Sequence, residues 1–466
     1  MVLNAGNILL VGAVLLFVSI LAGKAGSKFG VPVLLLFLGV GMVFGSDGLG
    51  IQFNSPTIAQ FIGMIALSVI LFSGGMDTKF KEIRPVLGPG IILATLGVMI
   101  TTAITGGIIF LVTRYFFGSI TLTLYKSLLL AAVISSTDSA SVFSILRSKG
   151  LRLKENLRPM LEFESGSNDP FAYMMTVILL SAMTGSVSGG SAVLLLIRQL
   201  AFGLLTGAAV AWLVTWLLKR YAFYGEGFDT IFVFAAAIIS YALASQIGGN
   251  GYLSVYLTGI ILGNQELKNQ KALVGFFDAF TGMMQMLLFF LLGLLAFPSQ
   301  MPSIVLPAIA IALFLTFVAR PAAVGLLLAP SKPPIGQYLV ISWAGLRGAA
   351  SIVFAIMATL SEGYMKYDIF HIVFCVVLFS IIFQGSLLPK VAEKCDMIDN
   401  STDVMRTFSD YTGDMQIQFV QLPIGDNHPW KNRKICEIEM LPGMLITVIR
   451  RGAQTIVPKG QTVILE

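Results

Sequence analysis

Long runs of apolar residues, separated by short polar segments, follow one another from the start of the chain to about residue 389. A helix that crosses a bilayer needs about 20 mostly apolar residues. The pattern therefore predicts an all-α polytopic membrane protein with about 13 transmembrane helices. We expect them near residues 5–22, 29–46, 57–73, 86–113, 125–147, 157–184, 190–217, 228–247, 252–264, 272–297, 303–328, 336–360 and 367–389.

Basic residues between these runs predict the orientation of the helices. Fifteen Lys and Arg side chains fall in one alternating set of loops, and the other set holds only Arg114, Lys126 and Lys366. Cytoplasmic loops carry the excess of basic residues, so we expect the N-terminus outside and the C-terminal tail in the cytoplasm of a bacterial cell, with the chain in the inner membrane. The opening segment MVLNAGNILL lacks the basic region of a signal peptide, so we interpret the first run as a span.

Charged residues divide the chain into two regions. Residues 1–389 hold 35 of the 54 charged side chains, and the shorter remainder holds the other 19. Charged residues make up 12% of the whole chain, against roughly 25% in soluble domains, which excludes an ordinary soluble protein and a disordered one. The net charge of +6 comes from the basic loops, and the sequence has no basic patch with interleaved aromatic residues. We therefore expect membrane lipid, and no nucleic acid, as a partner. Three scattered cysteines have no metal or redox spacing, and we expect no cofactor.

Ionisable residues within the predicted spans are candidate functional residues, because burying each costs several kcal/mol. The sixth span is the richest: Ser165 and Asp169 are four residues apart and share a helix face, beside the equally spaced Glu164 and Asn168. Pro170 follows and removes a backbone donor, which loosens the helix. The other candidates are Glu162, which can also be a simple cytoplasmic helix end near Arg158, Asp138 in the fifth span, Arg320 in the eleventh and Arg347 in the twelfth.

Two spans have the composition of broken helices. In the fifth, the run SSTDS surrounds Asp138 with hydroxyl groups, which compete with helical hydrogen bonds. Carboxylates, hydroxyls and unwound backbone suit a hard cation, although small residues also simply pack membrane helices. In the twelfth, glycines stand on both sides of Arg347, whose buried guanidinium needs a carboxylate. Glu164 is the best candidate partner, and this pair, like Arg320, has a purely structural interpretation as well.

The order of the spans predicts internal symmetry. The two broken spans are the fifth and the twelfth, and an odd offset of seven means that they run in opposite directions. Inverted repeats of this kind place the transport site where the broken helices cross. We therefore expect spans four to six to match spans eleven to thirteen.

Five motifs in these regions are similar to those of the cation/proton antiporter superfamily, in its CPA1 branch. They are LFSGGMD (71–77), STDSASVFSIL (136–146), ESGSND (164–169), GNGYLSVYLTGIILGN (249–264) and GLRGA (345–349). They cover nearly the whole membrane part in the family's order and are specific as a set. The run ESGSNDP resembles the potassium/proton antiporters called cell volume regulation protein A.

The resemblance implies roles for the matching residues. Asp169 would bind both the cation and the proton, and Asn168 before it is typical of the electroneutral branch, since electrogenic relatives tend to have a second Asp there. The resemblance also implies a homodimer, whose mobile core domain moves against a dimerisation domain in an elevator-type cycle. The remaining implied roles are a monovalent-cation site completed by Thr137, Asp138 and Ser165, and a structural ion pair between Glu164 and Arg347.

The tail resembles the TrkA-C domain, the C-terminal domain of regulators of potassium conductance. We expect a transmembrane antiporter domain over 1–389, a polar linker over 390–414 and a small α+β cytoplasmic regulatory domain over 415–466. Its pattern is MQIQFVQL, then a helix over HPWKNRKICEIEM, then a hairpin in which LITVIRR turns at Gly452. Such domains usually have one further strand, so we expect a short or truncated domain. The tail could bind a nucleotide regulator, although nothing in its sequence indicates a phosphate cradle, and the alternative is a module for dimerisation or folding.

The predicted function is secondary antiport of one monovalent cation, K⁺ rather than Na⁺, for one H⁺ at Asp169. One carboxylate can hold a proton or a cation, and competition at one site couples the two fluxes. The alternatives are an antiporter selective for Na⁺ and a potassium channel gated by the tail, although no TVGYG-like filter is present. A membrane enzyme is disfavoured, because His371 and His428 are the only histidines and no nucleophile or metal constellation accompanies them.

Overall fold

The protein was analysed as a computed structural model, which divides into two compact units, residues 1–400 and residues 401–466. In the first unit it describes residues 13, 17, 33–51, 55–115, 122–185, 189–220, 227–267, 270–361 and 368–399. In the second it describes residues 422, 424–425, 428–438, 445–451 and 454–465. The division falls inside the predicted linker.

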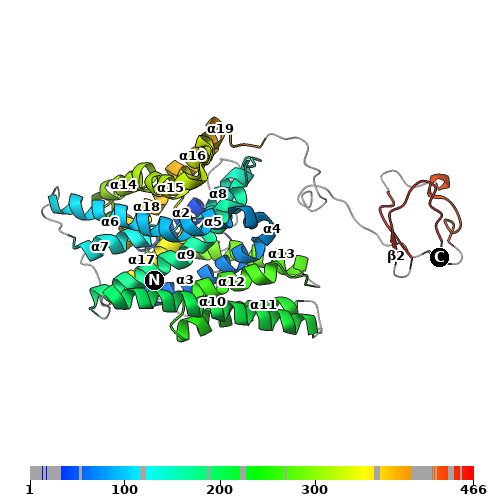
Figure 1. Cartoon of the computed structure of the whole chain (residues 1–466), viewed down its shortest axis with the longest axis horizontal. Helices are drawn as coiled ribbons and strands as arrows, with labels where there is room; N and C mark the ends of the chain where they lie inside the picture. Colours follow the sequence, from blue (N-terminus) through cyan, green and yellow to red (C-terminus); the bar gives the residue numbers. More distant parts are fainter. Residues whose placement is uncertain are drawn as a thin grey trace. The chain divides into compact units, whose positions relative to one another are not determined.

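Helices make up nearly all of the first unit (Figure 1). In chain order they are α2 (Val33–Phe44), α3 (Pro56–Asp77), α4 (Phe80–Ile83), α5 (Leu87–Ile92), α6 (Val98–Tyr115), α7 (Leu124–Val133), α8 (Ser139–Ser148), α9 (Leu157–Met183), α10 (Gly189–Arg220), α11 (Phe228–Gln246), α12 (Gly251–Gly263), α13 (Gln270–Leu295), α14 (Val305–Phe314), α15 (Arg320–Leu328), α16 (Ile335–Trp343), α17 (Ala349–Leu360), α18 (Ile369–Phe379) and α19 (Ser386–Lys394). Single 3₁₀ turns occupy Arg84–Val86, Pro298–Ser303 and Ala329–Ser331, and π turns occupy Leu93–Gly97, Leu315–Ala319 and Ser380–Gly385.

Within the described residues, seven helical segments are long and apolar enough to cross a membrane, and four shorter helices are apolar. All eleven fall within or overlap predicted spans. The helix α9 is not among them, because its first half is rich in polar residues. The first predicted span, 5–22, lies outside the described residues except for Ala13 and Phe17. The structure therefore confirms a mostly helical protein with seven helices long and apolar enough to span a membrane among the described residues, and the total of thirteen spans stays a prediction.

Both spans expected to be broken are interrupted in the structure. The helix α7 ends at Val133 and α8 begins at Ser139, while α16 ends at Trp343 and α17 begins at Ala349. The two interruptions meet, because the backbone N–H of Asp138 donates to the carbonyl oxygen of Leu346 at 2.8 Å. The fourth and eleventh spans, which the predicted inverted repeat would relate, each contain a π turn. The thirteenth span also contains a π turn, whereas its predicted partner, the sixth, does not, so the repeat stays a prediction.

The helices of the first unit pack in two groups. The helices α2, α3 and α10–α13 pack mainly on one another and are called the scaffold group; α4–α9 and α14–α19 do likewise and are called the core group. In Figure 1, α10 and α11 lie along one edge of the unit, and α14–α16 lie at the opposite edge. Glycines bring scaffold backbones together: a Cβ on Gly75 would lie 2.5 Å from the carbonyl oxygen of Tyr256. Such close approach makes the scaffold group a tightly packed body.

After α19 the chain pairs with the loop that leads into α9. The backbone N–H of Lys154 donates to the carbonyl of Met397, and that of Asp399 donates to the carbonyl of Arg152, both at 2.9 Å. We call the paired segments, residues 152–154 and 396–399, the clasp. Because α19 extends to Lys394, the helix continues beyond residue 389, where the predicted membrane domain ends.

The described residues of the second unit contain one short hairpin. Strands β1 (Ile449–Arg451) and β2 (Gln454–Ile456) pair antiparallel, with Ile449 opposite Ile456, as the alternation in LITVIRR predicted. The helix predicted over residues 428–440 is wrong: the described residues there form turns and one 3₁₀ turn, Ile435–Glu437. Residues 415–421 and Gly452 lie outside the described residues, so the complete α+β domain stays a prediction.

Candidate functional site

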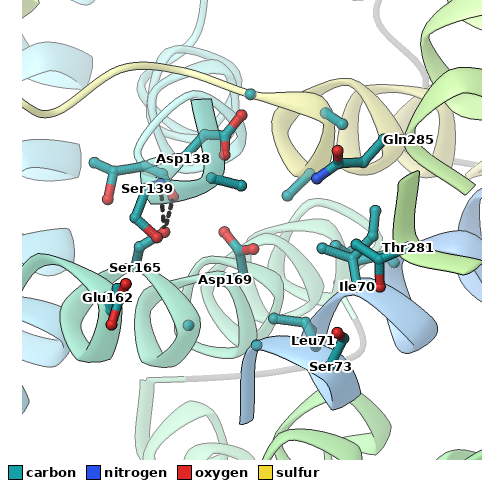
Figure 2. A pocket seen from close by; sticks show the side chains of 18 of the residues that line it. Ile70, Leu71, Ser73, Asp138, Ser139, Glu162, Ser165, Asp169, Thr281 and Gln285 are labelled. Atoms are coloured by element: carbon teal, nitrogen blue, oxygen red, sulfur yellow. Dashed lines mark hydrogen bonds between the residues drawn. The ribbon is translucent and has the colours of Figure 1, made fainter. Parts of the chain in front are cut away.

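A cavity of about 570 Å³ lies between the core group and the scaffold group. The core group contributes the interruption between α7 and α8, one face of α9 and the start of α17, and the scaffold group contributes α3, α12 and α13. Asp138 and Asp169 both line this cavity. Figure 2 shows the Asp169 carboxylate pointing into the space between Ser165 and Asp138 on one side and Gln285 and Thr281 on the other.

Asp169 sits in the first half of α9 and is 9% exposed. Its carboxylate accepts a hydrogen bond from the hydroxyl of Ser136, in the segment that interrupts the fifth span. Pro170 follows, and without an N–H it cannot donate to the carbonyl of Gly166. Ser136 was not among the predicted site residues. The SSTDS run signalled several hydroxyls, but only the folded segment shows which of them meets Asp169.

The side chains of α9 hold the interrupted segment in place. The amide of Asn168 donates to the hydroxyl of Thr137, and its oxygen accepts from the Thr137 backbone N–H at 3.4 Å. The hydroxyl of Ser165 accepts from the backbone N–H of Ser139 at 2.9 Å and donates to the Thr137 carbonyl at 2.7 Å. Thr137, Ser165 and Asn168 therefore lie close to one another and to Asp169. Asn168 does not line the cavity, so its contacts position the segment.

Asp138 caps a helix as well as lining the cavity. Its carboxylate accepts from the backbone N–H of Ser141 at 3.1 Å and from the Ser141 hydroxyl at 2.6 Å, which satisfies the N-terminus of α8. Its negative charge there also suits the positive end of the helix dipole. A Cβ on Gly348 would lie 2.4 Å from this carboxylate, so only glycine fits at the N-cap of α17.

The predicted ion pair between Glu164 and Arg347 is wrong, because Glu164 pairs with Arg320. The Oε1 of Glu164 lies 2.6 Å from Nη2 of Arg320, and both side chains are buried. Arg347 instead donates through Nη1 to the carbonyls of Ser135 at 2.6 Å and Ser136 at 3.0 Å. These carbonyls follow the C-terminus of α7, where the helix dipole favours a cation. With two arginines near one carboxylate, spacing along the chain could not choose between them.

Further acidic residues line the same cavity. Asp77 at the end of α3 and Asp278 in the first half of α13 are exposed, and Glu162 near the start of α9 is half-buried. Glu162 also pairs with Arg158 at 2.9 Å, the contact expected if it simply ends a helix. Neither Asp77 nor Asp278 was among the predicted site residues. Both lie near ends of apolar runs, where charge is common and gives no signal of a cavity.

Comparisons with known proteins agree on one family. The profile of the family described as sodium/hydrogen exchanger, transmembrane, matches residues 13–394. The K(+)/H(+) antiporter NhaP of Alkalimonas amylolytica is 40% identical over 388 residues, covering 83% of this chain and 66% of that protein. The K(+)/H(+) antiporter NhaP2 of Shewanella sp. (strain MR-4) is 34% identical over 469 residues, covering 98% of this chain and 79% of that protein.

Solved structures show the same fold. The sodium proton antiporter MjNhaP1 from Methanocaldococcus jannaschii at pH 8 matches with a TM-score of 0.71 and 23% identity. The match covers 82% of this chain and 97% of that one. The chain spans slightly less than two thirds of the Alkalimonas relative's length.

Proposed function

The chain belongs to the sodium/hydrogen exchanger family, and from this premise we propose that it is a secondary antiporter that exchanges K⁺ for H⁺ by competition at Asp169. The observation that carries the proposal is the buried Asp169 carboxylate, which faces the cavity and accepts a hydrogen bond from Ser136. Such a carboxylate holds a proton or a cation but not both. K⁺ is favoured over Na⁺ because relatives at 34–40% identity carry K⁺/H⁺ names.

Oxygen atoms around Asp169 suit a monovalent cation. The hydroxyls of Ser136 and Ser165, the carbonyl of Thr137 and the carboxylate of Asp138 belong to or border the same interrupted segment. Hard cations prefer such oxygen ligands. Because Asn168 is neutral, one bound cation replaces one proton with no change in net charge. We therefore infer 1:1 electroneutral exchange.

Alternating access follows from the position of the cavity between two packed groups. The core group carries Asp169 and Asp138, while the scaffold group supplies the opposite wall. Displacement of the core group along the scaffold group would carry the site across the membrane in an elevator-type cycle, and a homodimer would hold the scaffold still. In a bacterial inner membrane with the predicted orientation, the acidic residues Asp77, Glu162 and Asp278 face the cytoplasm and attract cations.

The clasp supports regulation by the tail. Besides the two backbone hydrogen bonds, the Lys154 ammonium pairs with Asp396 at 2.9 Å. Residues 396–399 lie within the predicted linker, and the loop that they pair with leads directly into α9. A force on the linker would therefore reach the helix that carries Asp169. The assignment of the tail as a TrkA-C-like domain rests on its sequence pattern.

Exchange by the purified full-length protein in proteoliposomes tests this function. Imposed K⁺, Na⁺ or Li⁺ gradients should each be compared for proton movement, with the membrane potential clamped at zero and at a negative value. We expect proton movement with K⁺ above Na⁺ and no response to the potential. Rapid K⁺ flux without proton movement would instead indicate a channel, and a potential-dependent rate would refute 1:1 exchange.

The variant Lys154→Met tests regulation through the clasp. If the clasp conveys regulation, this variant should change the exchange rate and leave the cation preference unchanged.

A further inference from the structure

One buried amide links the scaffold group to the core group beside the transport site. Asn250 at the N-terminus of α12 is fully buried, and its Nδ2 donates to the backbone carbonyl of Pro170 at 2.7 Å. Pro170 directly follows Asp169 on α9. The bond therefore joins the stationary wall of the cavity to the helix that carries the cation-binding carboxylate.

The scaffold holds Asn250 firmly. Its backbone N–H donates to the carbonyl of Gln199 at 3.0 Å, and its Oδ1 accepts from the N–H of Leu253 at 3.1 Å, which caps α12. The preceding turn is fixed as well, because the Arg198 guanidinium donates to the carbonyl of Ile247 at 3.0 Å. With its oxygen and backbone committed to the scaffold group, the side chain offers only its NH₂ group to the core group.

The core group and the scaffold group also pack together through a cluster of aromatic side chains, about one helical turn from Asp169. Tyr173, one turn beyond Asp169 on α9, contacts Tyr252 of α12 edge-on with ring centroids 5.0 Å apart. Phe354 of α17 lies 5.9 Å from Tyr173 and 6.1 Å from Tyr252 between centroids. Tyr252 and Phe354 are almost completely buried. The acidic side of the cavity thus lies on one side of Asp169, and a packed seal lies on the other.

We propose that Asn250 is a positioning residue that latches the core group in the inward-facing position, with the aromatic cluster as the seal that the latch holds shut. The proposal rests on alternating access as proposed above. A hydrogen bond of 2.7 Å is lost once the two atoms separate beyond about 3.5 Å, so any displacement of α9 along α12 by a few ångströms must break it. The latch sets how often the site reaches the outside, and it does not touch the cation.

The variant Asn250→Ser separates the latch from the cap. Serine can still cap α12 through its hydroxyl, but it is too short to reach Pro170. Ser240 of α11 is the control, because its hydroxyl hydrogen-bonds to Ser254 and Thr258 of α12 within the scaffold group, and Ser240→Ala leaves the Pro170 bond in place. The reporter is a cysteine at position 140, since Ala140 lines the cavity on the core group. Cys375, Cys395 and Cys436 are replaced by alanine in this background.

Labelling of the Ala140→Cys reporter by a membrane-impermeant maleimide, added to the outside of right-side-out vesicles, measures outward exposure. A neutral hydrogen bond changes a population by about twofold to tenfold, so Asn250→Ser should raise the outside labelling rate by that factor, while Ser240→Ala should leave the rate unchanged. Cation affinity of the purified variant should stay at the parent value. Equal rates for parent and Asn250→Ser, or equal increases in both variants, would overturn the latch. Absence of outside labelling in the parent and both variants would refute alternating access itself, and the latch with it.

Discussion

Replacing Glu164 with Gln tests the ion pair between Glu164 and Arg320, which the structure shows in place of the predicted pair with Arg347. Glu164 and Arg320 are buried, with their charged atoms 2.6 Å apart. Removing one partner of such a pair leaves an uncompensated buried charge and costs about 3–5 kcal/mol. Arg347 makes its hydrogen bonds to the carbonyls of Ser135 and Ser136 and interacts with the charge of Glu164 without an ion pair, so its coupling to Glu164 should be weaker than that of Arg320.

A double-mutant cycle gives this difference a measurable size. The pair Glu164→Gln with Arg320→Met should show a coupling energy of about 3 kcal/mol, because the double variant removes both charges together. The pair Glu164→Gln with Arg347→Met should show a smaller coupling energy, since these charges interact without forming an ion pair. The free energy of unfolding is measured by titrating the purified protein with a denaturing detergent, with circular dichroism as the readout of unfolding.

The reverse order of the two coupling energies would refute this reasoning. A stronger coupling between Glu164 and Arg347 would restore the pairing predicted from sequence. Equal coupling with both arginines would mean that the three side chains act as one network, so that no single pair could be assigned.

Further changes test the site and the loops around it. Ser136→Ala removes the hydrogen bond to Asp169 and should raise the KM for the cation about twofold to tenfold in proteoliposomes, and an unchanged KM would exclude Ser136 from the site. Asn168→Asp adds a carboxylate and should make exchange respond to an imposed membrane potential, whereas continued insensitivity would remove Asn168 as the basis of electroneutrality. The backbone N–H and side chain of Ser299 hydrogen-bond to the Asp47 carboxylate and lower its pKa below the usual 3.8. The stability that this carboxylate contributes is therefore present above about pH 4 and is lost as the pH falls through the lowered pKa. Asp47→Asn should therefore flatten the loss of Tm below about pH 4 in circular dichroism melts, and an unchanged acid slope would show that this bond does not contribute.

The sequence predicted the parts of the site that depend on local pattern. Hydroxyl groups around Asp138 and glycines around Arg347 indicated two broken helices, because both compositions weaken helical hydrogen bonding. The helix period placed Ser165 beside Asp169. The structure confirmed the interruptions and brought both acids to one cavity.

The errors lie where several groups compete in three dimensions. Arg320 and Arg347 are both buried cations, and only the packing of α15 against the rest of the core group brings Arg320 to Glu164. Likewise, Asn250 carried no charge and lay in a motif of small and apolar residues, so no residue-level signal identified it. Its contact with Pro170 spans 80 positions of the chain and exists only through the packing of α12 on α9.

Proton release on cation binding tests competition at Asp169 most directly. The purified full-length protein in weak buffer receives K⁺ or Na⁺, and the protons released are compared with the cations bound. Competition at one carboxylate predicts one proton released for each cation bound, and neither release nor binding by Asp169→Asn with its helical content intact. Proton release by Asp169→Asn equal to that of the unaltered protein would contradict the account and place the exchange site elsewhere.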